Sequence, residues 1–135
     1  MKSGADYQLS MSLDDEIAHF FVTGSLTSTA MDDLRAEGLG FLRESKAKAI
    51  VWEIRTKNTY PGIAEAYVRA RNVPMDYRQV PSAIVDGSRN REFEAFYETT
   101  AMNAGLTVRY FSEVAAAKAW LKSRIEGRQA ISYKL

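Results

Sequence analysis

The segment from Pro81 to Leu121 constrains the fold of this chain more than any other part of the sequence. It contains a short apolar run, 83–85, and a second strand-like segment, 107–111, and each is followed by a stretch with the apolar spacing of a helix. Gly105 stands where the first of these helices should end, and glycine is common there because it adopts the left-handed conformation without a steric penalty. The segment therefore predicts the order strand, helix, strand, helix.

The preceding part of the chain predicts three more strands and two more helices. Alternation over 7–13 and an apolar run over 16–23 predict a hairpin, because only a short acidic turn connects them. The remaining elements are expected to be a helix from about Thr27 to Ser45, a buried strand over 49–52, a polar loop over 55–59 and a helix from Pro61 to Asn72. Within the first helix, Gly38 lies on the apolar stripe, which suggests close packing against the sheet.

Strands that alternate with helices predict one α/β domain over residues 1–135. We expect a five-stranded mixed sheet with the first strand antiparallel and the others parallel. Because crossovers between parallel strands are right-handed, about four helices should lie mainly on one face. Segment 124–135 is expected to be a frayed tail or a short extra strand. The expected core residues are Ile50, Trp52, Ile84, Phe96 and Trp120.

The composition excludes several classes of function. Lys plus Arg number 18 and Asp plus Glu 17, so the net charge of +1 predicts no nucleic-acid partner. The chain has no cysteine, which excludes thiolate metal sites and fits a cytoplasmic location. No run approaches the ~20 apolar residues of a membrane-spanning helix, so no transmembrane segment is expected.

Two motifs resemble the SpoIIAA-like (STAS-type) family of bacterial domains. They are Ala83-Ile84-Val85-Asp86-Gly87 and the strand–helix pattern from Val108 to Leu121, and the resemblance extends over about residues 5 to 123. It implies a sequential β-α fold with one antiparallel edge strand. In that family, anti-sigma-factor antagonists change partners when a serine at the start of the second helix is phosphorylated. Other relatives distantly resemble lipid-transfer proteins.

The chain departs from the antagonist pattern at the phosphorylation site. It has Thr56-Lys57-Asn58-Thr59-Tyr60-Pro61-Gly62 where antagonists carry an acidic residue followed by serine. The resemblance therefore implies the location of a switch, and Thr59 is the nearest hydroxyl and the candidate for regulatory phosphorylation.

The candidate binding site lies in the loops that follow the parallel strands, because ligands of open α/β sheets collect there and helix N-termini favour anions. Its predicted residues are Thr27, Ser28, Arg55, Thr56, Lys57, Asn58, Thr59, Tyr60, Asp86, Ser88 and Arg89. The alternative is that the hydroxyl residues are helix caps and the cations are merely solvated. The loop over 74–79 could also line a pocket or an interface.

No catalytic residue, cofactor or metal site is predicted. His19 is the only histidine, and no nucleophile in a recognisable elbow accompanies it. We therefore expect a non-enzymatic regulatory module that docks a protein partner or associates with itself. The alternative is a carrier or sensor of a small apolar or anionic, lipid-like ligand.

Overall fold

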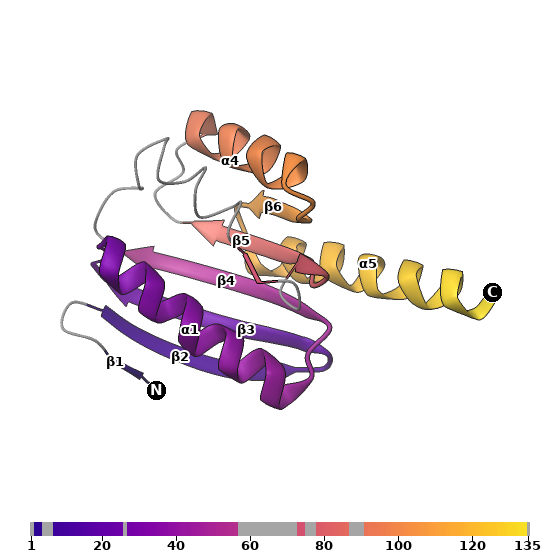
Figure 1. The fold of residues 1–135 in the computed structure, drawn as a ribbon, viewed down its shortest axis with the longest axis horizontal. Helices are drawn as coiled ribbons and strands as arrows, with labels where there is room; N and C mark the ends of the chain where they lie inside the picture. Colours follow the sequence, from indigo (N-terminus) through magenta and orange to yellow (C-terminus); the bar gives the residue numbers. More distant parts are fainter. Residues whose placement is uncertain are drawn as a thin grey trace.

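The computed structural model describes residues 2–3, 7–25, 27–56, 73–74, 78–86 and 91–134 (Figure 1). In chain order its elements are β1 (Lys2–Ser3), β2 (Tyr7–Asp14), β3 (Ile17–Gly24), α1 (Ser28–Ser45), β4 (Ala49–Thr56), β5 (Ser82–Asp86), α4 (Arg91–Asn103), β6 (Val108–Phe111) and α5 (Val114–Lys134). The helix predicted from Pro61 lies outside the described residues.

The strands form one mixed sheet with the order β1-β2-β3-β4-β5-β6. The pairs β1–β2 and β2–β3 are antiparallel, and the pairs from β3 to β6 are parallel. This confirms the α/β class and the mixed sheet, and the short β1 adds a sixth strand to the five predicted. The hairpin turn contains Asp15 at φ 60°, a left-handed conformation that aspartate tolerates better than most residues.

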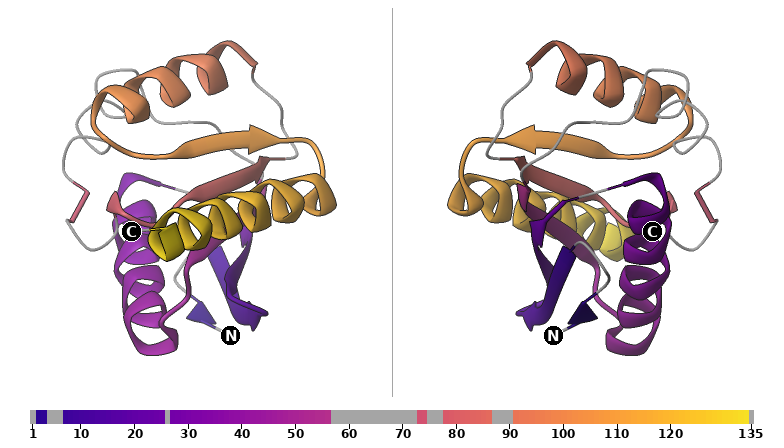
Figure 2. Two further views of the ribbon diagram at one scale, coloured as in Figure 1. Left: turned by 90° about the vertical axis from the view of Figure 1, so that its right-hand side faces the viewer. Right: turned by 90° about the vertical axis from the view of Figure 1, so that its left-hand side faces the viewer.

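The described helices cover both faces of the sheet, so the prediction that they lie mainly on one face holds for α1 and α4 but not for α5. Ala18 and Phe20 of β3 pack in the cluster that contains Leu34 of α1, whereas Ile17 packs with Leu121 of α5. Successive residues of a strand point to opposite faces, so α1 and α5 lie on opposite sides (Figure 2). The described residues contain three helices, α1, α4 and α5.

The handedness of crossovers explains this difference. α1 and α4 each connect strands of the parallel part of the sheet, and the right-handed rule places such helices on the same face. α5 follows the last strand and connects to no further strand, so the rule does not assign its face. Val85 and Val51 leave an apolar surface on the second face, and α5 covers it with Ala117, Leu121 and Ile125.

On the α1 face, three aromatic rings fill the space between helix and sheet. The centroid of the Phe20 ring lies 5.8 Å from that of Phe41 and 4.5 Å from that of Trp52. A Cβ atom on Gly38 would lie 3.2 Å from the Trp52 ring and 3.3 Å from the Phe20 ring. The predicted close packing of Gly38 is therefore confirmed.

The core prediction is confirmed for Ile50 and only partly for the other four residues. Ile50 is fully buried. The other four, Trp52, Ile84, Phe96 and Trp120, are half-buried, and the two tryptophans pack at the margins of the two larger core clusters.

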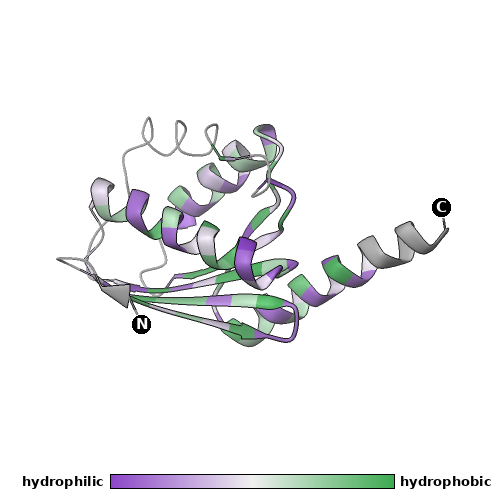
Figure 3. Cartoon of the chain, turned by 60° about the horizontal axis from the view of Figure 1, so that its bottom comes forward, coloured by the Kyte–Doolittle hydropathy of each residue, from purple (hydrophilic) through white to green (hydrophobic). Residues whose placement is uncertain are grey.

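Segment 124–134 continues α5 and forms neither a frayed tail nor an extra strand. Ala117, Leu121 and Ile125 are spaced four residues apart and keep the helix on the sheet. α5 as a whole is also rich in alanine, lysine and arginine, which favour a helix, and its interior glycine costs only about 1 kcal/mol. In Figure 3 the coloured turns of α5 run outward past the ends of the strands.

Candidate functional site

Three of the predicted site segments meet at the carboxyl end of the sheet, where the parallel strands finish. In the sheet register, Gly24 of β3 is the partner of Thr56 in β4, and Ile54 of β4 is the partner of Asp86 in β5. α1 begins at Ser28, four residues after the last residue of β3, and lies next to the end of β4 (Figure 1). The topology therefore brings Thr27, Thr56 and Asp86 to one end of the sheet.

Thr27 is the N-cap of α1. Its backbone is extended, with φ −99° and ψ 172°, and its Oγ1 accepts a hydrogen bond of 3.1 Å from the Ala30 N–H. Its carbonyl oxygen accepts the first helical bond, from Met31 N–H at 2.9 Å. Ser28 is the first helical residue. The hydroxyl of Thr27 thus has the capping role that the sequence left open, while the residue stays exposed.

Asp86 is buried at the end of β5, with a relative exposure of 6%. A carboxylate taken out of water normally requires polar partners. Asp86 does make polar interactions within the protein. Asp86 is therefore a buried carboxylate at the carboxyl end of a strand that has neighbours on both sides.

Arg55 lies in β4 and not in a loop, which corrects the prediction. β4 continues to Thr56 because β3 runs beside it to Gly24, so both strands complete their backbone hydrogen bonds. The guanidinium Nη2 of Arg55 lies 3.2 Å from Oε2 of Glu53. The positive charge of Arg55 is therefore offset by the Glu53 carboxylate, so Arg55 does not supply an unpaired cation to an anion in the loops.

The remaining predicted site residues lie outside the described residues. They are Lys57, Asn58, Thr59, Tyr60, Ser88 and Arg89.

A polar cluster on the α5 face of the sheet escaped the sequence analysis. His19 Nε2 and Glu53 Oε1 are 3.0 Å apart, and the other oxygen of Glu53 binds Arg55. Glu53 is only 15% exposed. The strand alternation already puts His19 on the same face as Ile17, and Glu53 on the same face as Val51. Only the register of β3 against β4 shows that the two side chains meet.

The arrangement around His19 serves structure better than nucleophilic catalysis. Ser12 of β2 is its cross-strand partner. However, the backbone N–H groups beneath these side chains belong to the sheet ladder, so they cannot serve as oxyanion donors. Instead, His19 binds Glu53 across β3 and β4, and Glu53 also binds Arg55 within β4.

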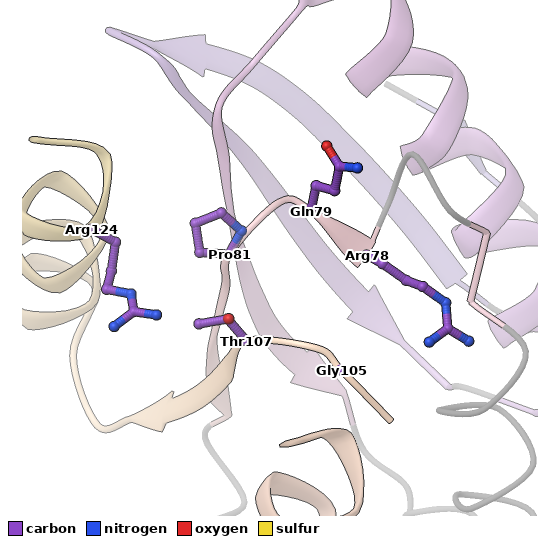
Figure 4. A pocket seen from close by; sticks show the side chains of 6 residues that line it. All are labelled: Arg78, Gln79, Pro81, Gly105, Thr107 and Arg124. Carbon is purple, nitrogen blue, oxygen red and sulfur yellow. The ribbon is translucent and has the colours of Figure 1, made fainter. Parts of the chain in front are cut away.

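The described residues also line a shallow, half-open pocket at the opposite end of the parallel strands. It is lined by Arg78, Gln79, Pro81, Gly105, Thr107 and Arg124, and its volume is about 350 Å³ (Figure 4). Arg78 and Gln79 belong to the loop that the sequence analysis named as a pocket candidate. Among the described residues there is no group of three or more His, Cys, Asp or Glu side chains placed to hold a metal ion.

Comparison with known proteins assigns neither family nor activity. No protein-family model matches the chain, and no curated protein resembles it significantly. Among the described helices, none combines the length and the apolar character needed to cross a membrane.

Proposed function

We propose that this chain is a non-enzymatic regulatory module that docks a protein partner at the carboxyl end of its sheet. The observation that carries the proposal is the convergence of three segments there: the capped start of α1 at Thr27, the end of β4 at Thr56 and the end of β5 at Asp86. Ends of neighbouring parallel strands and a helix N-terminus form a continuous surface that suits recognition.

The loop from Lys57 to Tyr60 extends this surface in sequence, because it follows Thr56 directly. In the SpoIIAA-like family that the chain resembles, antagonists carry the phosphorylated switch residue at this position. Under this proposal Thr59 is the modified residue, and a phosphate on it would add a charge of about −1.5 to −2 next to the docking surface.

A role as the carrier of an apolar ligand is the less favoured function. On the α1 face, the rings of Phe20, Phe41 and Trp52 pack against one another between helix and sheet. An apolar ligand in that layer would have to displace these rings, which costs free energy, whereas docking leaves the core unchanged.

Site-specific crosslinking tests the docking proposal. A photo-crosslinking residue at Thr56 should capture a protein partner in cells of the native host, because Thr56 lies at the carboxyl end of the sheet. The same residue at Glu44, which is exposed in the last turn of α1 at the other end of that helix, serves as the control. Equal capture at both positions, or capture at neither, contradicts the proposal.

Threonine variants then test the switch. Thr59→Ala should leave the melting curve unchanged and prevent any change in partner affinity that phosphorylation causes. Thr99→Ala removes an exposed hydroxyl from α4 and is the matched control. If phosphorylation changed the partner affinity equally in Thr59→Ala and in wild-type protein, Thr59 would not be the switch residue.

A further inference from the structure

Two aromatic rings form a surface patch where α5 passes beside β6 (Figure 2). The ring centroids of Phe111 and Trp120 lie 5.5 Å apart, at an interplanar angle of 47°. Phe111 is the last residue of β6, and Trp120 belongs to α5. Both rings are half-buried, because one side packs against the core cluster beneath α5 and the other stays in contact with solvent. The patch therefore has a fixed apolar base that a partner can reach.

Each of the two rings has an arginine over it. The guanidinium carbon of Arg109 lies 5.4 Å from the centroid of Phe111, and that of Arg124 lies 5.8 Å from the centroid of Trp120. Both arginines are exposed. A ring quadrupole attracts a cation without neutralising it, so the N–H donors of the guanidinium remain available to an anion. These four residues are called the arginine–aromatic patch below.

The arginines of the patch keep their positive charge. Within the part of the chain that the structure describes, neither guanidinium forms an ion pair or a hydrogen bond. The lysines on the hairpin side of α5 differ, since Lys118 lies 2.8 Å from Asp14 and Lys122 lies 4.0 Å from Asp15. α5 thus has paired cations toward the hairpin and an unpaired cation toward β6.

α4 closes the backbone of β6 to an added strand. β6 is the last strand of the described sheet, and the Tyr110 N–H donates a hydrogen bond of 2.8 Å to Oε2 of Glu98 in α4. An added strand would need that N–H, which is already satisfied. We therefore expect a partner to contact the side chains of the patch and not to extend the sheet.

The chemistry of the patch favours an acidic protein segment. Arginine and aromatic side chains are enriched in protein interfaces, and guanidinium groups bind carboxylates through paired hydrogen bonds. Two copies of this chain that met through the same patch would bring arginine against arginine, which is repulsive. The net charge of +1 provides no general attraction to nucleic acid.

We propose that the arginine–aromatic patch binds an acidic segment of a protein partner. Carboxylates of the segment bind the guanidinium groups of Arg109 and Arg124. An apolar side chain of the same segment covers the rings of Phe111 and Trp120. The proposal is independent of docking at the carboxyl ends of β4 and β5, because it uses none of the residues that carry that function.

Fluorescence anisotropy tests the proposal with a labelled, glutamate-rich peptide that contains leucine. The full chain should bind this peptide saturably, and replacement of the glutamates by glutamine should abolish binding. Replacement of leucine by serine should weaken binding, because the rings lose their apolar contact. Arg109→Gln and Arg124→Gln should each weaken binding about tenfold, the usual effect of losing one charge-assisted hydrogen bond.

Lys122→Gln is the matched control. Lys122 is also an exposed cation of α5, so its loss changes the net charge equally, but it lies on the hairpin side of the helix. The affinity should stay almost unchanged. The proposal is overturned if the wild-type protein does not bind the peptide or binds the glutamine version equally well. Equal weakening in Lys122→Gln and Arg124→Gln would also refute it, since general charge attraction would then explain the result.

Two further measurements separate other occupants of the patch. Tighter binding of a single-stranded oligothymidine than of the peptide would assign the patch to nucleic acid. A wild-type dimer in sedimentation that Arg124→Gln dissociates would assign it to a second copy of the chain. Either result contradicts an acidic protein segment as the partner.

Amide chemical shifts locate the bound peptide without a variant. The peptide should shift the backbone amide signals of Arg109, Phe111 and Arg124. Shifts confined to Thr27 and Thr56 would place the peptide at the carboxyl end of the sheet. That outcome would refute the arginine–aromatic patch as the site and leave the proposed docking function intact.

Discussion

Two glycines in α1 provide a matched test of how this helix packs on the sheet. Gly38 and Gly40 are both interior residues of the same helix, so replacement by alanine raises helix propensity by about 1 kcal/mol at either position. At Gly40 no atom lies within 4 Å of the added methyl group. Gly40→Ala should therefore stabilise the protein by about 1 kcal/mol.

At Gly38 the same methyl group meets the aromatic layer. It would lie 3.2 Å from two atoms of the Trp52 ring and 3.3 Å from Phe20, closer than ordinary carbon contacts. Phe20 is fully buried and packs against Phe41 as well, so it has little room to move. Overpacking of this kind costs about 1–3 kcal/mol. After subtraction of the propensity gain, Gly38→Ala should destabilise the protein by about 0–2 kcal/mol.

Urea unfolding followed by circular dichroism measures the difference between the two variants. If the slope of the free energy against urea stays constant, the midpoints report stability directly. The Gly38 variant should unfold at lower urea than the Gly40 variant, with an altered near-ultraviolet signal from Trp52. Equal stabilisation by both alanines would mean that α1 does not approach the sheet as closely as described.

Three further changes test other parts of the fold. Thr27→Ala should lower the free energy of unfolding by about 1 kcal/mol, and Thr27→Ser should largely retain it, in the same urea assay. Trp120→Ala should cost less than the ~3–5 kcal/mol of a fully buried tryptophan, because this residue is half-buried. The Lys118 ammonium, 2.8 Å from Asp14, lowers the pKa of that carboxyl below its ordinary value of 3.8. Its stabilising effect is therefore present above pH 3.8 and is lost as the pH falls through the lowered pKa, so Asp14→Asn should reduce stability slightly at pH 7 and leave it unchanged near pH 2. If Asp14→Asn reduced stability at pH 2 as much as at pH 7, the ion pair with Lys118 would not be the cause.

Periodicity predicted the elements of the sheet well because it reflects burial directly. The alternation over 7–13 and the apolar run over 49–52 mark strands with one and two covered faces, and both strands are present as β2 and β4. Gly105 was expected to end α4, and its φ of 84° confirms the left-handed cap. These features depend on neighbours in the sequence, so a single chain is enough to predict them.

The errors arise where long-range contacts decide the structure. Arg55 looks like a loop residue in sequence, but the partner strand beside it extends β4 by several residues. Ile131 and Tyr133 alternate as in a strand, yet they continue a helix that begins at Val114 and packs through Ile125. In both cases the deciding partner lies far away in the chain, so local spacing could not indicate it.

The candidate sites also divide into features set by local sequence and features set by long-range contacts. The capping role of Thr27 follows from its place before a helical stretch, and it was one of two alternatives from sequence. The pocket joins Arg78, Thr107 and Arg124, which come from three separate parts of the chain. No spacing rule connects these residues, because the order of β5 and β6 in the sheet and the face taken by α5 bring them together.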